Sequence, residues 1–484
     1  MCAKHRNPTD DELRRDESGT LMPRHRVRIA LGYPAPYKVG SASLGFQTLY
    51  RLWNHHPLVS CERFFFGDLR QPTSVTLETR TPPNALDALA FSVSCETELL
   101  PVVAMLSHLG LAPLRRDRPD DAIPVIIGGP LTYLSPHLVA PIADAVVHGE
   151  AEEAAGPIAD ALARHPSHLG RTDKAAFLDA LPQAFGIWVP ARTDDPPPPH
   201  IVPATALPAV AATWSPHAEL RDLFLVEIAR GCPRGCAFCV MSRTAQGTGP
   251  FRSVNPDTVL AAIPDTAPGV GLVGAAVTDH PHLLDIAVPL VNRGQRVSLS
   301  SMRADRIGEP LLQALVRSGL RTLTVAADGA SERLRREIHK GITREHLVEA
   351  ATLARHQGLA GMKLYSMLGL PGETDDDIAE FAALALHLHA VLRLTLGVQP
   401  FVPKPRTPLA DVPMVPVTEL DRRFALLRRL LKGRVPLSPV SPKWAWVDWK
   451  LAHGGTASAC AACHALEGGG NFAAWRRALD ACGL

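Results

Sequence analysis

The sequence predicts an α/β protein with two parallel sheets, and three observations support this fold class. Short apolar strands alternate with helices in two successive blocks, a pattern typical of parallel sheets whose faces are covered by helices. A run of prolines at 196–199 separates the blocks. Hydrophobic residues make up 46% of the 484 residues, enough for the cores of two or three domains. We predict a Rossmann-like parallel-sheet domain, then a partial (β/α)6 TIM barrel, and a small C-terminal helical domain.

The domain boundaries are placed where the composition changes. Residues 1–25 are dense in charge and poor in apolar side chains, so we expect them to form a disordered tail. The first domain spans 26–204 and ends with the proline-rich linker, the barrel spans 205–410, and the C-terminal domain spans 411–484.

In the first domain, buried strands and helices follow one another regularly. The expected strands are 27–31, 89–93, 124–130 and 143–147, and the expected helices are 43–53, 98–109 and 150–164. Ligands of such open sheets bind at the carboxyl ends of the strands, where the strand order reverses.

The barrel is predicted from strands that recur with room for a helix after each. The expected strands are 223–229, 271–277, 296–303, 321–326, 362–368 and 394–398. Barrel enzymes keep their chemistry at the carboxyl ends of the strands, so the loop after the first strand is a candidate site.

That loop contains three cysteines, Cys232, Cys236 and Cys239, at the spacing C-x3-C-x2-C. Thiolates are soft ligands that favour iron–sulfur clusters, zinc or copper. A structural zinc ion prefers four protein ligands, and the loop holds no fourth cysteine or histidine. Three thiolates would fill three corners of a four-iron cluster and leave one iron open to a ligand that is not protein. A zinc site and an ordinary loop are the alternatives.

Residues 232–239, Cys-Pro-Arg-Gly-Cys-Ala-Phe-Cys, resemble the cluster motif of the radical S-adenosylmethionine (radical SAM) superfamily. Gly-Leu-Pro-Gly-Glu at 369–373 and the proline-rich run at 400–408 also resemble stretches found in that family. The resemblance implies that the three cysteines hold a [4Fe–4S] cluster whose open iron is chelated by SAM. It also implies reductive cleavage of SAM to methionine and a 5′-deoxyadenosyl radical.

The same resemblance suggests which residues contact SAM. Ser300 and Arg303 end the third barrel strand, and Asp328 and Ser331 follow the fourth, at positions that bind SAM in the family. Two features depart from the family pattern: the second strand ends without Gly-Gly-Glu, and Asp328 stands where a longer glutamate is usual. The alternative for Ser331 is a plain helix start.

The first domain resembles the cobalamin-binding-like domain that precedes many radical SAM enzymes. The resemblance is carried by Gly128, Gly129 and Pro130, together with Ala-Asp at 143–144 and Gly-Glu at 149–150. It implies a cobalamin held near the 127–130 turn. The Asp-x-His-x-x-Gly signature that would supply a lower histidine ligand is missing, so a domain that binds no cofactor is the alternative.

Three further cysteines lie near the C-terminal end, at Cys460, Cys463 and Cys482. The string Cys-x2-Cys-His at 460–464 matches the haem c attachment pattern, which requires export. Half of a metal site completed by Cys482 is one interpretation, and chance placement in an alanine-rich helix is the other.

The charge balance and the beginning of the chain indicate which partners and which compartment to expect. Lys and Arg number 50 against 48 Asp and Glu, so the net charge of +2 favours neither nucleic acid nor an anionic membrane. The beginning of the chain lacks the apolar core of a signal peptide, and free thiols favour a reducing compartment, so we expect a cytoplasmic protein.

Together with these features, the resemblance implies a radical SAM enzyme with a cobalamin-dependent methyltransferase-type reaction on an unactivated centre. A cobalamin-independent radical reaction (rearrangement, oxidation or methylthiolation) is one alternative, and a non-catalytic cluster-binding protein is another. The cofactors would be a [4Fe–4S] cluster, SAM and cobalamin. The partners would be a small-molecule or peptide substrate and a reductant such as flavodoxin or ferredoxin.

Overall fold

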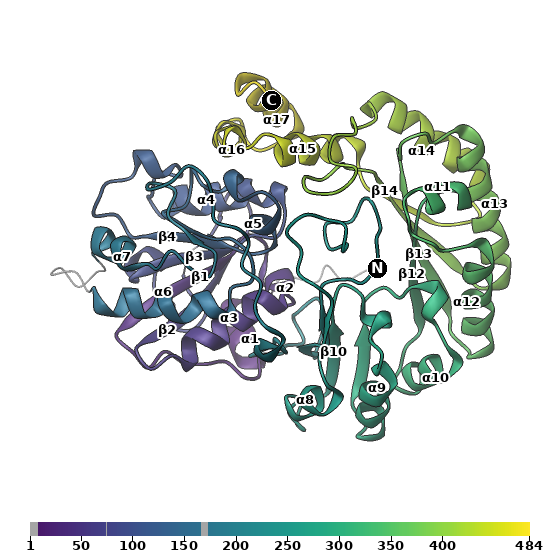
Figure 1. Cartoon of the computed structure of the whole chain (residues 1–484), viewed down its shortest axis with the longest axis horizontal. Coiled ribbons are helices and arrows are strands. Elements are labelled where there is room, and N and C mark those ends of the chain that lie inside the picture. Colours follow the sequence, from purple (N-terminus) through teal and green to yellow (C-terminus); the bar gives the residue numbers. More distant parts are fainter. Residues whose placement is uncertain (1–7, 74, 166–172) are drawn as a thin grey trace. The chain divides into compact units, whose positions relative to one another are not determined.

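The computed structural model describes residues 8–73, 75–165 and 173–484. The chain divides into two compact units, Met1–Leu225 together with Gly454–Leu484, and Val226–His453 (Figure 1). The stretch 411–484, predicted to be one domain, is therefore shared between the two units.

The first unit contains a six-stranded sheet in the order β2-β1-β3-β4-β5-β6. Its strands are β1 (Val27–Tyr33), β2 (Val59–Phe65), β3 (Ala88–Ser92), β4 (Val125–Gly128), β5 (Ala145–Val147) and β6 (Ile187–Trp188). Neighbouring strands are parallel except β6, which runs antiparallel to β5. The first five strands have the flavodoxin-like doubly wound order, whose switch point lies between β1 and β3. The prediction of a parallel sheet in this region is confirmed.

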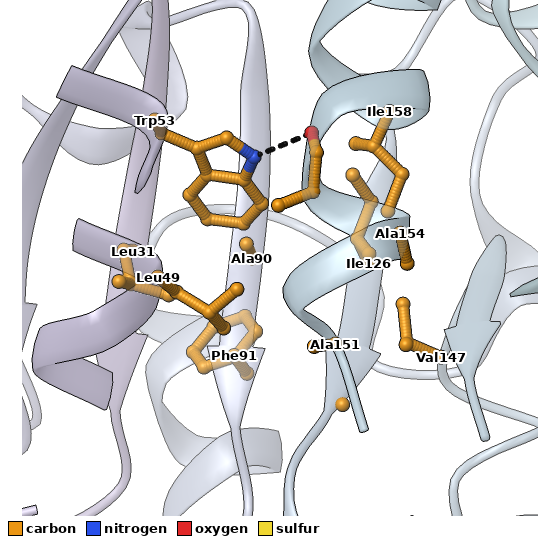
Figure 2. A pocket seen from close by; sticks show the side chains of 12 residues that line it. Leu31, Leu49, Trp53, Ala90, Phe91, Ile126, Val147, Ala151, Ala154 and Ile158 are labelled. Carbon is orange, nitrogen blue, oxygen red and sulfur yellow. Dashed lines mark hydrogen bonds between the residues drawn. The ribbon is translucent and has the colours of Figure 1, made fainter. Parts of the chain in front are cut away.

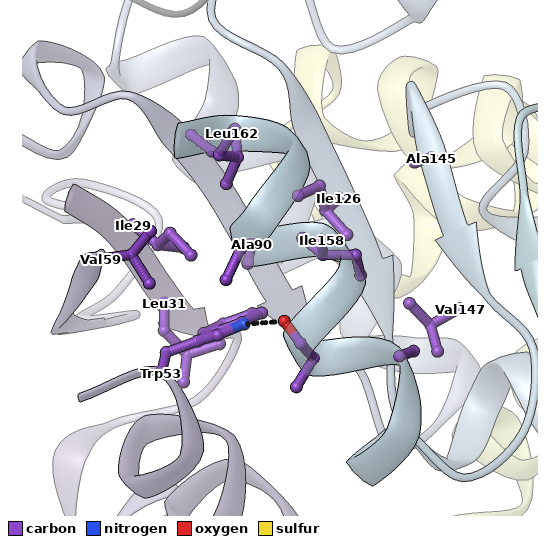
Figure 3. Close-up of a cluster of buried hydrophobic side chains, with 14 of the residues drawn as sticks. Ile29, Leu31, Trp53, Val59, Ala90, Ile126, Ala145, Val147, Ile158 and Leu162 are labelled. Atoms are coloured by element: carbon purple, nitrogen blue, oxygen red, sulfur yellow. Dashed lines mark hydrogen bonds between the residues drawn. The ribbon is translucent and has the colours of Figure 1, made fainter. Parts of the chain in front are cut away.

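Helices cover both faces of this sheet (Figure 1). The helices of this unit are α1 (Asp10–Asp16), α2 (Tyr37–Gly40), α3 (Leu44–His55), α4 (Leu99–His108), α5 (Pro130–Leu134), α6 (Glu152–Arg164), α7 (Lys174–Ala180), α16 (Ala457–Glu467) and α17 (Phe472–Ala481). Trp53 of α3 and Ile158 of α6 pack in one buried cluster with Leu31, Ala90 and Ile126 of the sheet (Figure 3). Burial of this apolar surface is the main force that holds α3 and α6 on the sheet.

The prediction of a disordered tail at 1–25 is wrong for residues 8–25, which are ordered. Residues 1–7 lie outside the described residues. Helix α1 begins with a capping box between Thr9 and Glu12, and Leu13 is buried. Glu17 forms a fully buried ion pair with Arg63 of β2, at 2.5 Å. A buried guanidinium needs charged partners, because an unpaired charge in the core is very costly. The ion pair of Glu17 with Arg63 therefore anchors the segment that follows α1 to the sheet.

The second unit contains parallel strands whose spatial order follows their order in the sequence. They are β7 (Phe224–Glu227), β10 (Gly269–Val273), β11 (Arg296–Leu299), β12 (Thr322–Asp328), β13 (Gly361–Leu368), β14 (Leu394–Pro400) and β15 (Leu437–Pro439). They form two sheets, β7-β10-β11 and β12-β13-β14-β15, and a parallel bridge between Met302 and Val325 links one to the other. A barrel of βα units has this sequential order.

The helices of the second unit follow the strands as the sequence predicts. They are α8 (Pro256–Ala261), α9 (Leu283–Asn292), α10 (Glu309–Arg317), α11 (Glu332–Glu337), α12 (Arg344–His356), α13 (Asp375–Val391), α14 (Val417–Leu431) and α15 (Pro442–His453). Helix α13 begins with a capping box between Thr374 and Asp377. Within the ranges that the structure describes, none of the helices is long and apolar enough to cross a membrane.

Candidate functional site

The three-cysteine loop has a firmly tied base. Strand β7 continues into β8 (Ala229–Arg230), which pairs antiparallel with β9 (Arg252–Ser253) on the far side of the loop. Gly231 follows β8 with a φ of +77°, and a Cβ at this position would lie 2.7 Å from the carbonyl oxygen of Pro250. Glycine is therefore required where the loop closes.

The loop folds back on itself around its cysteines. The amide of Cys239 donates to the carbonyl of Cys236 at 3.2 Å, and the amide of Ser242 donates to the carbonyl of Cys239 at 3.1 Å. Burial raises the pKa of the Cys239 thiol, and the negative charges of Cys236 and Cys232 add to the rise. Metal binding at such thiols must displace their protons.

A second segment, between α11 and α12, packs against this loop. The amide of Ala237 donates to the carbonyl of Ile338 at 3.0 Å, and the thiol of Cys236 donates to the carbonyl of His339 at 3.8 Å. The segment is held by Arg335, whose fully buried guanidinium donates to the carbonyl of Ile342 at 2.7 Å. The position of the second cysteine thus depends on residues about a hundred positions further along the chain.

Charged side chains that lie near the ends of β11 and β12, and between α11 and α12, act electrostatically on Cys236. Lys340 pairs with Asp328 at 2.5 Å, and Arg303 pairs with Asp305 at 3.0 Å. Arg303 also donates to the carbonyl of Lys340 at 3.0 Å, which joins the two ion pairs. Burial raises the pKa of the Cys236 thiol, while the positive charges of Lys340 and Arg303 oppose that rise. The site therefore provides cations that act on the buried sulfur of Cys236, against the negative charges of Asp328 and Cys232.

Asp328 has an unusual backbone conformation. Its φ is +63°, in the left-handed region, and the pairing of β12 with β13 is irregular between Ala326 and Asp328. A non-glycine residue in this region is strained, and strained residues cluster at functional sites. The conformation accompanies the ion pair of the Asp328 carboxylate with Lys340.

A cavity of about 530 Å³ opens beside the loop. One wall is formed by Pro233, Arg234 and Gly235, which lie between the first two cysteines. The lining also includes Arg303 and Lys340. The cavity is therefore adjacent to the loop and strongly basic.

The predicted SAM contacts differ in their location and burial. Arg303 and Asp328 lie close enough to influence Cys236 electrostatically, and Ser300 is exposed directly after β11. Ser331 is fully buried; its hydroxyl donates to Asp377 at 2.5 Å and accepts from the amide of Leu334 at 3.2 Å. Because Ser331 caps α11 and has no exposed surface, the helix-start interpretation explains it, and we drop it from the proposed contacts.

Lys340 is a site residue that the sequence reasoning missed. Its pairing with Asp328 and its effect on Cys236 are tertiary, since the three residues come from separate segments. Locally, the sequence shows only that Lys340 follows the helix after Asp328, and this position alone does not indicate a site residue.

In the first unit, Gly128, Gly129 and Pro130 have a structural explanation. Gly128 ends β4, Pro130 begins α5, and Gly129 between them has a φ of +108°. A Cβ on Gly129 would lie 2.6 Å from the carbonyl oxygen of Val93. The turn therefore needs glycine for the close approach of two backbones.

A small apolar cavity lies between the sheet of the first unit and helices α3 and α6 (Figure 2). Trp53 closes it by donating from Nε1 to the carbonyl of Ala155 at 3.1 Å. Its volume is about 20 Å³, which is the size of a single water molecule. Gly128 lines this cavity, but a corrin ring does not fit inside it.

The cysteines near the C-terminal end lie on helices of the first unit. Cys460 and Cys463 are one turn apart on α16, and Cys482 follows α17, with its Sγ 3.7 Å from Nδ1 of His464. Across the described ranges, no group of three or more His, Cys, Asp or Glu side chains is arranged to hold a metal ion. The predicted half of a metal site is therefore not assembled here.

The residues of the three-cysteine loop do fit a cluster of several irons. Among the described residues, these three cysteines are not arranged to hold a single metal ion either. A four-iron cluster holds its thiolates further apart than a single ion does. The donors are soft, the loop is tied at its base, and Lys340 and Arg303 offset the negative charge of bound thiolates.

These observations describe an α/β protein whose three-cysteine loop follows the first parallel strand of its second unit, β7, at the carboxyl end. Residues 226–385 match the family model described as the radical SAM superfamily, and residues 45–190 match the one described as radical SAM proteins, N-terminal. The chain belongs to the radical SAM superfamily.

Two curated relatives and a group of solved structures are similar to parts of the chain. The uncharacterized protein MJ0966 of Methanocaldococcus jannaschii is 36% identical over 188 residues, which cover 38% of this chain and 41% of that protein. The uncharacterized methyltransferase PH0819 of Pyrococcus horikoshii is 25% identical over 268 residues, covering 52% of this chain and 56% of that protein. The chain thus spans about half the length of these relatives.

The cobalamin-dependent SAM radical enzyme OxsB, in a structure with aqua-cobalamin bound, is similar in fold. The TM-score is 0.51 at 13% identity, and the match covers 86% of this chain and 58% of OxsB. At this identity the likeness concerns the fold alone.

Proposed function

We propose that this protein is a radical SAM enzyme that binds a [4Fe–4S] cluster through Cys232, Cys236 and Cys239 and cleaves SAM reductively. The observation that carries the proposal is the tied loop, which places Cys236 beside Lys340 and Arg303. The sequential strand order supports a partial (β/α)6 barrel around this site.

Each part of the site would have a definite task. When bound, the reduced cluster supplies the electron that cleaves SAM to methionine and a 5′-deoxyadenosyl radical. The three thiols hold the cluster as thiolates, and Lys340 and Arg303 stabilise their negative charge. The Asp328 carboxylate, fixed by Lys340, would accept from the SAM amine or ribose, and Ser300 would contact its polar groups.

Anaerobic reconstitution with iron and sulfide tests the proposal. With dithionite and SAM, the reconstituted protein should form 5′-deoxyadenosine, and the Cys236→Ala variant should form none. Failure of the cluster-containing wild-type protein to form 5′-deoxyadenosine would favour a non-catalytic cluster-binding protein instead.

The finer proposal is a cobalamin-dependent methyl transfer to an unactivated centre of a small molecule or peptide in the cytoplasm. Two observations support it: one relative is named a methyltransferase, and the fold is similar to that of an enzyme described as cobalamin-dependent. The small cavity beside Gly128 does not accept a corrin, so the site would lie outside it, at the carboxyl ends of the strands.

A cobalamin-independent reaction (rearrangement, oxidation or methylthiolation) is the competing possibility, because Gly129 is already explained by backbone packing. Loading the protein with cobalamin separates the two. A cobalt absorbance band that persists after gel filtration supports methyl transfer, and its absence at saturating cobalamin supports the competing reaction.

A further inference from the structure

We propose that a cavity near the amino end of β5 binds a small organic carboxylate with an apolar body. The cavity, here called the arginine cavity, has a volume of about 230 Å³, and Arg115, Trp188, Thr456 and Cys460 are among the residues that line it. Its lining residues all belong to the first unit. Such a site is independent of the three-cysteine loop, which belongs to the second unit.

The arginine cavity lies away from the carboxyl ends of the strands. Ala140 and Pro141 line it and precede β5. Arg115 lies in the connection that leads to β4, and its amide donates to the carbonyl of Pro141 at 2.7 Å. Ligands of doubly wound sheets ordinarily bind at the opposite edge, at the carboxyl ends of the strands. The arginine cavity is therefore distinct from the turn at 127–130, near which cobalamin would bind.

The guanidinium of Arg115 lacks a partner of opposite charge. Its Nε is buried without a hydrogen-bond partner, and in the part of the chain that the structure describes no carboxylate forms an ion pair with Arg115. Asp194 also lines the cavity but is exposed, and Asp117 pairs with Arg116 at 3.7 Å. A buried donor without an acceptor is costly, so a bound anion would satisfy a group that the protein leaves unsatisfied.

A neighbouring guanidinium, that of Arg118, increases the need for an anion. The Arg118 side chain is fully buried and pairs with Asp144 at 3.3 Å. Burial lowers the pKa of Arg118, and the positive charge of Arg115 contributes to the lowering. Negative charge beside Arg115 would offset the repulsion between the two arginines.

The amino end of α16 adds a second preference for negative charge. Thr456 is the N-cap residue of this 11-residue helix and makes no side-chain capping bond, and Cys460 lies in the turn that follows. Both residues line the arginine cavity. The amino end of a helix carries partial positive charge and favours anions. An unpaired arginine and a helix end from distant parts of the chain thus meet at one cavity.

The remaining walls indicate the rest of the ligand. Leu114, Pro141 and Trp188 line the cavity, and the Trp188 ring stands edge to face with that of His137, with centroids 5.5 Å apart. Pockets for drug-sized ligands measure roughly 300–1,000 Å³, so this smaller cavity suits a smaller molecule. A guanidinium fork matches the geometry of a carboxylate. A monocarboxylate with a single ring or a short chain fits both the charge and the walls.

Titration calorimetry of the full-length protein tests the site with three probes: benzoate, its neutral counterpart benzamide, and inorganic phosphate. The test variants are Arg115→Met, which removes the charge, and Arg115→Lys, which keeps the charge but lacks the planar fork. The matched control is Arg164→Met, because Arg164 lies on α6, outside the lining, with 66% of its side chain exposed. Melting temperatures without a probe check that each variant folds.

A second readout locates the bound probe. Cys460 lines the arginine cavity and Cys482 does not, and both are partly exposed. Saturating benzoate should slow the alkylation of Cys460 by iodoacetamide and leave that of Cys482 unchanged. Mass spectrometry measures the two rates separately.

A carboxylate site predicts a defect that depends on charge. Arg115→Met should raise the Kd of benzoate by about ten-fold or more, as the loss of a hydrogen bond between charged groups does. Arg115→Lys should raise it less, and Arg164→Met should match the wild type. Benzamide should bind the wild-type protein about ten-fold more weakly than benzoate, for the same reason.

The contrary results are distinct. An equal benzoate Kd in the wild type, Arg115→Met and Arg115→Lys, or equal binding of benzoate and benzamide, would overturn the site. Unchanged alkylation of Cys460 under saturating benzoate would place the binding elsewhere and would also overturn it. Phosphate that displaces benzoate at equal concentration would overturn the assignment of a carboxylate with an apolar body.

Discussion

The chain contains two groups of three cysteines whose surroundings differ. The loop cysteines (Cys232, Cys236 and Cys239) lie on a glycine-closed loop tied by a strand pair, and the positive charges of Lys340 and Arg303 act on Cys236. The tail cysteines (Cys460, Cys463 and Cys482) lie on or after helices. Burial, together with negative charges led by that of Cys460, raises the pKa of Cys463 to about 11.

The comparison teaches that cysteine count alone does not make a cluster site. Metal ligands must be thiolates, so a site needs groups that stabilise negative charge and a backbone that can wrap around the metal. In the loop, Cys236 has the cationic neighbours Lys340 and Arg303, and the backbone around it is not helical. In the tail group, Cys463 lies on a helix and the charges that act on it are negative.

The largest expected effect is on iron binding. Replacing all three loop cysteines by alanine should remove the iron, about four atoms per chain in the reconstituted wild type, together with the brown colour. The triple Cys460→Ala, Cys463→Ala, Cys482→Ala variant should keep both. Iron and sulfide analysis measures the result, and equal iron loss in the two variants would contradict the comparison.

The second prediction concerns the cations near the loop cysteines. Lys340→Met removes the partner of Asp328 and leaves that carboxylate to repel the cluster thiolates. We expect SAM cleavage to fall by about 10–100-fold, as is typical when a group that supports metal ligands is removed, with most of the iron retained. Lys432→Met, at an exposed position after α14, is the control and should behave as wild type. Undiminished cleavage in Lys340→Met would remove this lysine from the site.

The third prediction concerns the reactivity of a tail thiol. Because the pKa of Cys463 is raised to about 11, its thiolate is scarce near pH 8 and becomes abundant only as the pH rises through 11. Alkylation by iodoacetamide at pH 8 should be about 100-fold slower than for the unfolded chain. Mass spectrometry of the folded and the denatured protein gives both rates, and similar rates would contradict the assigned environment.

The smallest effect concerns the glycines that flank the two groups. Gly231 precedes Cys232 and Gly483 follows Cys482, and both have positive φ. A Cβ would collide with Pro250 only at Gly231, since nothing lies within 4 Å of the Cβ position at Gly483. Gly231→Ala should cost about 2–3 kcal/mol and Gly483→Ala about 1 kcal/mol or less. Melting temperatures of the apo-protein compare them, and equal shifts would argue against a tightly closed loop.

Sequence reasoning succeeded where the signal was local. The alternation of strands and helices and the three-cysteine loop after the first barrel strand are both encoded within short windows. Sequence reasoning failed where a charged side chain is buried because its ion-pair partner lies far away in the sequence. Strand β2 was missed because Glu62 and Arg63 interrupt its apolar run, yet both are fully buried.

The pairing partners of β2 explain that failure. Arg63 is paired with Glu17 and Glu78, and Glu62 with Arg28. Glu17 belongs to the segment expected to be disordered, so one buried arginine accounts for two errors. In the same way, the role of Lys340 depends on a tertiary contact with Asp328 that no local pattern reveals.

The central claim is that three thiolates leave one iron open to SAM, and electron paramagnetic resonance tests it most directly. The dithionite-reduced, reconstituted protein should give a [4Fe–4S]⁺ signal whose g-values shift when SAM is added, because SAM becomes a ligand of the open iron. A signal that is identical with and without saturating SAM would contradict the account.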